Sequence, residues 1–155
     1  MALHRCAVVG VGQTHHTSCR GDVSIAGLVR EAVDRALLDA NMTLADIDAI
    51  VIGKAPDMLE GVMMPELWLT DSLAASGKPL FRVHTAGSVG GSTAIVAAQH
   101  VMSGLHKRVL TIAFEKQSDG RSIRIGFKRY IIDETHSEDV VNQWFNNIIE
   151  APAEE

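Results

Sequence analysis

The stretch that decides the fold is Ala86-Gly87-Ser88-Val89-Gly90-Gly91-Ser92-Thr93-Ala94. It joins a strand-like apolar run, residues 80–85, directly to a run of small residues with helical character that reaches Met102. A helix that begins at such a junction directs unpaired N–H groups and the positive end of its dipole at whatever lies over the turn. This arrangement favours thiolates, oxyanions and phosphates, so the sequence predicts an anion-binding turn here.

Length and composition indicate one soluble domain. Of the 155 residues, 46% are hydrophobic and 21% are charged, and no apolar run approaches the roughly 20 residues that cross a bilayer. The N-terminus lacks the apolar region of a secretory signal, and Cys6 and Cys19 form neither a disulfide framework nor a metal-binding motif. We therefore expect a cytoplasmic protein without a membrane span. The net charge of −5 argues against nucleic acid as a partner.

Strand-like and helix-like segments alternate along the chain. Short apolar runs predict buried strands over residues 6–11, 47–52, 80–85 and 108–114. Helices are predicted from a cap at Ser24, over residues 65–76 and from the Gly87 turn to Met102. A further strand over 122–132 and a helix over 140–149, preceded by a capping box at 135–138, are also expected. The order βαβαβαβ predicts the α/β class, with a mainly parallel sheet covered by helices, plus a C-terminal strand and helix.

Four separated motifs carry a family resemblance. They are Val8-Val9-Gly10-Val11-Gly12-Gln13-Thr14, Asp46-Ile47-Asp48-Ala49-Ile50, the loop and helix at 83–98, and Arg108-Val109-Leu110-Thr111-Ile112-Ala113-Phe114-Glu115-Lys116. In their order and spacing the chain resembles the N-terminal part of the thiolase superfamily. The closest resemblance is to sterol-carrier-type thiolases and to thiolase-like aldolases that act on CoA thioesters of steroid side chains.

The resemblance implies an organisation for the whole chain. Residues 1–118 are expected to form a thiolase-like N-terminal, partial domain, and residues 119–155 a divergent strand and helix packed on it. It further implies a homodimer, an acyl-CoA thioester as substrate and no tightly bound cofactor. Small OB-fold acyl-CoA-binding proteins are the partner proteins that it suggests.

The chain departs from the family at the position of the nucleophile. In thiolases the turn before the third helix carries a reactive cysteine, and matching on Gly91-Ser92-Thr93-Ala94 puts that position at Ser88, or at Gly87 one step earlier. A thiolate at a helix N-terminus has a lowered pKa, whereas a serine hydroxyl needs a partnered base. The family's later histidine and second-cysteine motifs have no counterpart here, so we expect this chain alone to be incomplete for acyl transfer.

Retro-aldol cleavage of a CoA thioester fits the residues better, because it needs a general acid/base and an oxyanion pocket instead of a covalent thiolate. In this hypothesis Ser88 and His84 are the catalytic candidates. The anion-binding candidates are the backbone N–H groups of Gly87, Ser88, Val89, Gly90 and Gly91. Two alternatives remain open: Ser88 as a helix N-cap and His84 as a structural histidine.

Other motifs have weaker support. Residues 86–90 differ by one substitution from the G-x-S-x-G elbow of α/β-hydrolases, but Asp133 and His136 are too close together to supply its acid and base from separate loops. Gly10 and Gly12 lack the third glycine of a dinucleotide-binding loop. The pair at residues 15 and 16, both histidines, has no accompanying ligands at metal-binding spacing, so no metal site is predicted.

Methionines near Trp68 are open to two interpretations. Met58, Met63 and Met64 either line a lipid or steroid cavity or fill gaps in a core or an interface.

Two functional hypotheses of different kinds follow. In the first, the chain is a thiolase-like protein of lipid or steroid acyl-CoA metabolism without the nucleophilic cysteine, at most a CoA-thioester lyase or an acyltransferase-related subunit. In the second, it is a non-catalytic, truncated thiolase-like module that dimerises or docks on a partner. Turnover by the purified chain distinguishes the two.

Overall fold

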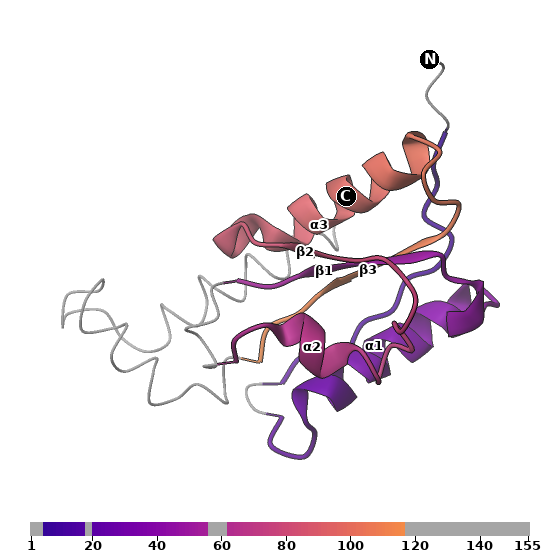
Figure 1. Ribbon diagram of the computed structural model, residues 1–155. Coiled ribbons are helices and arrows are strands. Elements are labelled where there is room, and N and C mark those ends of the chain that lie inside the picture. Colours follow the sequence, from indigo (N-terminus) through magenta and orange to yellow (C-terminus); the bar gives the residue numbers. More distant parts are fainter. Residues whose placement is uncertain (1–4, 18–19, 56–61, 117–155) are drawn as a thin grey trace.

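A three-stranded parallel sheet forms the centre of the molecule (Figure 1). The computed structural model describes residues 5–17, 20–55 and 62–116. The strands are β1 (Ala49–Gly53), β2 (Leu80–Val83) and β3 (Val109–Ala113), in the order β2-β1-β3. Every residue of the central strand β1 is buried, which explains its uninterrupted apolar sequence. These three predicted strands are confirmed, with ends that differ by at most two residues from the apolar runs.

Helices cover both faces of the sheet. Helices α1 (Ile25–Asp39) and α2 (Pro65–Leu69) lie on one face, and α3 (Val89–Met102) lies on the other (Figure 1). A one-turn 3₁₀ helix at Leu44–Asp46 leads into β1, and a second at Ala86–Ser88 leads into α3. The predicted α/β class with a mainly parallel, helix-covered sheet is therefore confirmed.

Helix α1 begins and packs as its sequence predicts. The Ser24 hydroxyl accepts a hydrogen bond from the Gly27 amide at 3.1 Å and so caps the first turn. Its buried residues recur at helical spacing and face the sheet: Leu28, Val29, Val33 and Leu37. Of these, Val29, Val33 and Leu37 join the main core with buried residues of β1, β3 and the α2 region, namely Ile50, Ile52, Leu69, Leu73, Leu110 and Ile112.

Helix α2 is shorter than the predicted 65–76. Pro65 occupies the first turn as expected, but the helix ends at Leu69. The chain then turns back through Ala74, which has a left-handed φ of 46°, and the Ala75 amide donates to the Thr70 carbonyl at 2.9 Å. This turn interrupts a segment whose apolar spacing alone looks helical.

The predicted first strand, residues 6–11, is wrong. This segment has no strand pairing in the structure, and the side chains of Val8, Val9 and Val11 are exposed. Its backbone packs on α1 instead: a Cβ added at Gly12 would lie 2.1 Å from the Ala32 carbonyl oxygen. The Val11 amide donates to the Asp39 carboxylate at 2.9 Å, so it is not available to a sheet. An apolar cavity of about 480 Å³ lies along this segment and β3.

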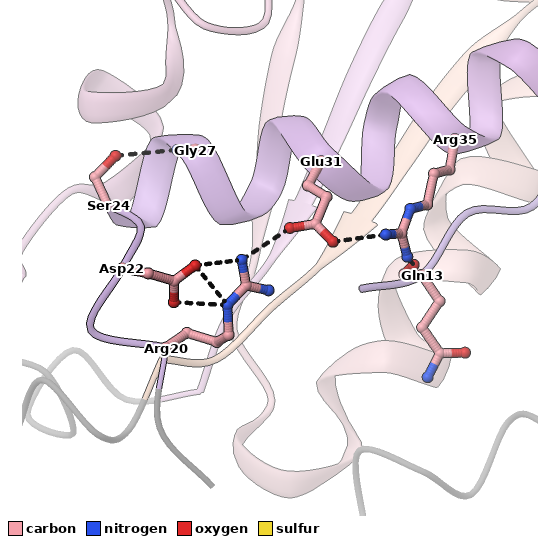
Figure 2. Close-up of polar contacts among 7 residues, drawn as sticks. All are labelled: Gln13, Arg20, Asp22, Ser24, Gly27, Glu31 and Arg35. Carbon is pink, nitrogen blue, oxygen red and sulfur yellow. Dashed lines mark hydrogen bonds and ion pairs between the residues drawn. The ribbon is translucent and has the colours of Figure 1, made fainter. Parts of the chain in front are cut away.

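A chain of charged side chains connects the loop before α1 to the helix itself (Figure 2). The Arg20 guanidinium contacts the carboxylates of Asp22, at 2.9 Å, and Glu31, at 3.0 Å, and Glu31 also accepts from Arg35 at 2.8 Å. Arg35 in turn donates to the backbone carbonyl of Gln13. The hydrogen bonds with Asp22 and Glu31 raise the pKa of Arg20, and the one from Arg20 lowers the pKa of Asp22.

Several predictions fall outside the described residues. They are the strand over 122–132, the helix over 140–149 with its capping box at 135–138, and the division of the chain at residue 118. Among the helices of the described segments, none combines the length and the apolar character that a membrane span requires.

Candidate functional site

The topology places a switch point at the carboxyl ends of β1 and β2. The chain leaves β1 toward α2 on one face of the sheet and leaves β2 toward α3 on the opposite face (Figure 1). Where neighbouring parallel strands send their connections to opposite faces, an opening forms between the two loops, and ligands of α/β proteins bind there. The residues after β2 therefore stand at the position that the fold favours for a site.

The turn from β2 into α3 is tight and strained. Ala86 has a φ of 48°, the left-handed region that residues with a Cβ rarely adopt. The 3₁₀ helix at Ala86–Ser88 follows at once, and α3 begins at Val89. Backbone strain of this kind accumulates at functional sites and persists only where the surrounding packing enforces it.

Close packing on β1 enforces the turn. A Cβ added at Gly53, the last residue of β1, would lie 1.9 Å from the Thr93 hydroxyl and 3.0 Å from the Val89 side chain. The first turn of α3 therefore rests directly on the β1 backbone. Thr93 is fully buried, and its hydroxyl donates to the Val89 carbonyl at 2.6 Å.

Ser88 is exposed at the end of the 3₁₀ turn. Its hydroxyl donates to the Thr85 carbonyl oxygen at 2.9 Å. The residue stands at the N-cap position of α3, yet its side chain accepts no hydrogen bond from the helix. Ser88 thus occupies the N-cap position, but its side chain does not cap the helix.

The backbone N–H groups of the turn divide into two sets. The Ser88 amide donates to the Thr85 carbonyl at 3.2 Å, and the Val89 amide donates to the Ala86 carbonyl. These two N–H groups are used inside the turn. Gly90 and Gly91, which follow in the first turn of α3, occupy positions where helical N–H groups have no intrahelical acceptor. Gly87, the fifth candidate, lies within the 3₁₀ helix.

His84 is exposed and lies directly after β2, in the segment that leads into the turn. No hydrogen bond joins it to Ser88 within the part of the chain that the structure describes. The two candidates thus share one end of the sheet without forming a nucleophile and base pair. Two other hydroxyl groups are hydrogen-bonded across the turn, because the Thr85 hydroxyl donates to the Ser92 hydroxyl at 2.9 Å.

Two buried charged residues at the same end of the sheet escaped the sequence analysis. Lys54 follows β1 with a side chain only 1% exposed, and Glu115 lies two residues after β3 with a side chain 3% exposed. The Lys54 Nζ and the Glu115 Oε2 are 3.9 Å apart, and Glu115 also accepts from the Ala55 amide. Buried charges are costly and need such partners. The signal in the sequence was a charged residue within two positions of the end of β1 and of β3.

The other motifs obtain no support here. Within residues 5–17, 20–55 and 62–116 no group of three or more histidine, cysteine or acidic side chains is arranged to hold a metal ion. Asp133 and His136, the weak hydrolase partners, lie outside the described residues. Met63, Met64 and Trp68 are exposed rather than buried in a core.

Comparison with curated proteins finds relatives that match most of this chain. Sterol carrier protein 2 of Homo sapiens is 28% identical over 145 residues, which is 92% of this chain and 26% of the relative. The protein of the same name from Bos taurus is 31% identical, over 91% of this chain and 26% of its own length. Acetyl-CoA acetyltransferase of Methanothermobacter thermautotrophicus is 31% identical, over 73% of this chain and 30% of its own. The chain spans about a quarter of the length of these relatives.

Solved structures share the fold. The 3-oxoacyl-[acyl-carrier-protein] synthase III from Aquifex aeolicus aligns with a TM-score of 0.56 at 23% identity, covering 65% of this chain and 32% of that one. The priming β-ketosynthase of the R1128 polyketide pathway aligns with a TM-score of 0.53 at 24% identity, covering 64% and 30%. No protein-family model matches the chain. The solved structures show the same fold, and the sequence relatives show that the chain belongs to the thiolase superfamily.

Proposed function

We propose that this protein acts on a CoA thioester of lipid or steroid metabolism, as a lyase of the retro-aldol type that works without a covalent nucleophile. The observation that carries the proposal is the hydrogen bonding of the Ser88 hydroxyl. This hydroxyl stands where the family resemblance puts the reactive cysteine, but it donates to the Thr85 carbonyl, and no histidine of the described segments is bonded to it. The names of two relatives, acetyl-CoA acetyltransferase and sterol carrier protein 2, support the choice of substrate class.

The proposed reaction uses the turn as an anion site. A base removes the proton of the substrate's β-hydroxyl, the bond between Cα and Cβ breaks, and a carbonyl product leaves. The electron pair of that bond moves into the thioester and forms an enolate, which then takes a proton at Cα. Donors placed where this negative charge develops lower the barrier, and the Gly90 and Gly91 amides at the α3 N-terminus fill that role in the proposal. His84, exposed directly after β2, is the acid/base candidate.

Turnover of a β-hydroxyacyl-CoA by the purified chain tests this proposal. We expect release of a shortened acyl-CoA, and a fall of more than about tenfold in kcat for His84→Gln, a size that general acid–base catalysis commonly supplies. His15→Gln, on the exposed loop before α1, is the matched control and should retain the rate. Equal rates in the two variants would remove His84 from the mechanism, and absence of turnover would reject the lyase.

A non-catalytic docking module is the second candidate, and an exposed apolar surface favours it. The surface consists of Met63, Met64, Leu67 and Trp68, at and before α2, and each side chain is more than half exposed. Strand β2 is also an edge strand of the described sheet. We infer that this side of the molecule pairs with a second copy of the chain or with an OB-fold acyl-CoA-binding protein, in the cytoplasm. Association without turnover would support this function over the lyase.

A further inference from the structure

Two histidine rings lie side by side at the end of α3 that is remote from the anion-binding turn. His100 belongs to the last turn of α3, and His106 lies in the loop that leads to β3. Their ring centres are 5.4 Å apart with a 31° angle between the planes. Phe81 of β2 packs against His100 at 4.4 Å and lies 6.4 Å from His106. The His106 amide donates to the His100 carbonyl at 3.3 Å, so the backbone holds the pair together.

Each ring has one buried nitrogen for which the described residues provide no hydrogen-bond partner. These atoms are Nδ1 of His100 and Nε2 of His106. Buried polar atoms in folded proteins nearly always have a partner, and an orphaned one points to a bound water or ion. The nitrogen of a neutral imidazole that carries no proton can bind a metal ion. Two such nitrogens on neighbouring rings therefore point to a metal ion as the absent partner.

We propose that His100 and His106 together bind a divalent transition-metal ion, with water in the remaining positions. A zinc ion bound to a ring nitrogen lies about 3.2 Å from the ring centre, and at a tetrahedral angle two such rings have centres about 5.2 Å apart. The observed separation of 5.4 Å is close to this distance. The χ2 torsion of histidine is broad, so rotation of the rings changes the direction in which the two nitrogens point.

The surroundings favour a cation of this class. The C-terminal end of α3 carries the negative end of the helix dipole, which stabilises positive charge at its last turn. Two imidazoles select zinc, copper or nickel, whereas magnesium and calcium require oxygen ligands. The 14-residue helix separates this pair from the anion-binding turn by about 20 Å, so the inference does not rest on the proposed lyase.

Calorimetric titration of the 155-residue chain with Zn²⁺ tests the proposal. We expect one ion per chain, with binding weakened at least tenfold in His100→Gln and in His106→Gln. His84→Gln replaces an exposed histidine at the other end of the sheet and should bind as the unchanged chain does. No Zn²⁺ binding, or equal binding by the His100→Gln/His106→Gln double variant, would overturn the proposal.

A second measurement needs no variant and is therefore independent of folding defects. In long-range ¹H–¹⁵N spectra of the unchanged protein, Zn²⁺ should shift the ring ¹⁵N resonances of His100 and His106. Shifts confined to other histidines would assign the ion elsewhere and contradict the site.

Discussion

Ala86 adopts a left-handed backbone at the point where β2 turns toward α3, with a φ of 48°. This conformation costs a residue with a Cβ about 1–2 kcal/mol, and glycine adopts it freely. The residue next to it is a glycine, Gly87, yet the positive φ falls on the alanine. The strain thus lies at the turn that the proposed function uses.

Replacement of Ala86 by glycine should relieve this strain. We expect Ala86→Gly to raise the free energy of unfolding by up to about 1 kcal/mol, because the gain in the folded state exceeds the added entropy of the unfolded chain. Ala94→Gly, at an exposed position inside α3, is the control and should lower it by about 1 kcal/mol. Urea unfolding measures both, and the same sign for the two changes would contradict the strain.

A thiol at position 88 should report the electrostatics of the turn. In a background with Cys6 and Cys19 replaced by serine, we expect Ser88→Cys to react with iodoacetamide at neutral pH faster than Ser103→Cys. The first thiol lies at the N-terminus of α3, where the dipole favours the thiolate, and the second lies at its C-cap, where the dipole opposes it. Both positions are exposed, so access does not distinguish them. Equal pH profiles for the two thiols would remove the basis for an anion site.

At the scale of elements, contact between α3 and β1 decides where the helix begins. Gly53 has no room for a side chain, because the side chains of Thr93 and Val89 occupy the space that a Cβ would need. In Gly53→Ala the first turn of α3 must move, and overpacking of this kind lowers stability by about 1–3 kcal/mol.

Gly91→Ala provides the matched comparison for Gly53→Ala. Nothing lies within 4 Å of a Cβ added at Gly91, so we expect unchanged or slightly higher stability in thermal unfolding. If both variants lost stability equally, the close packing at Gly53 would not be the cause.

The 3₁₀ helix before β1 has a pH-dependent cap. The Asp46 carboxylate accepts from the Thr43 amide and hydroxyl, each at 2.9 Å, and these bonds lower the pKa of Asp46 below its usual value. A depressed pKa adds stability above the unfolded-state value and loses it as the pH falls through the folded-state value. We expect Asp46→Asn to destabilise the chain at pH 7 and to have a smaller effect near pH 2 to 3. A pH-independent difference in melting temperature would contradict this account.

At the scale of the whole molecule, several apolar side chains at and just before α2 are exposed among the described residues. If the surface formed by Met63, Met64, Leu67 and Trp68 associates with a second copy, Trp68→Lys should shift sedimentation toward the monomer and leave the far-ultraviolet circular dichroism unchanged. Leu38→Lys, on α1, is the control, because Leu38 is 82% exposed and lies outside that surface. A chain that is monomeric at all concentrations before mutation would reject self-association.

The order of β1, β2, β3 and the helices between them, and the turn that joins β2 to α3, could be predicted from the chain itself. Apolar runs located β1, β2 and β3, and the Ser24 cap and helical spacing located α1, because these signals act over a few neighbouring residues. The residues of the family resemblance also indicated the superfamily. None of these conclusions required long-range contacts.

Contacts between distant segments decided the rest. Residues 6–11 look like a strand, but the Gly12 backbone fits against Ala32 of α1 and the Val11 amide bonds to Asp39. The same is true of the Lys54–Glu115 pair and of the packing of Phe81 against His100, which bring together residues far apart in the sequence. The positive φ of Ala86 is likewise enforced by packing and is not visible in any local sequence pattern. Local propensity and periodicity specify which elements form. Packing specifies which polar groups meet and where the backbone is strained, because these contacts and strains depend on distances between segments that exist only after folding.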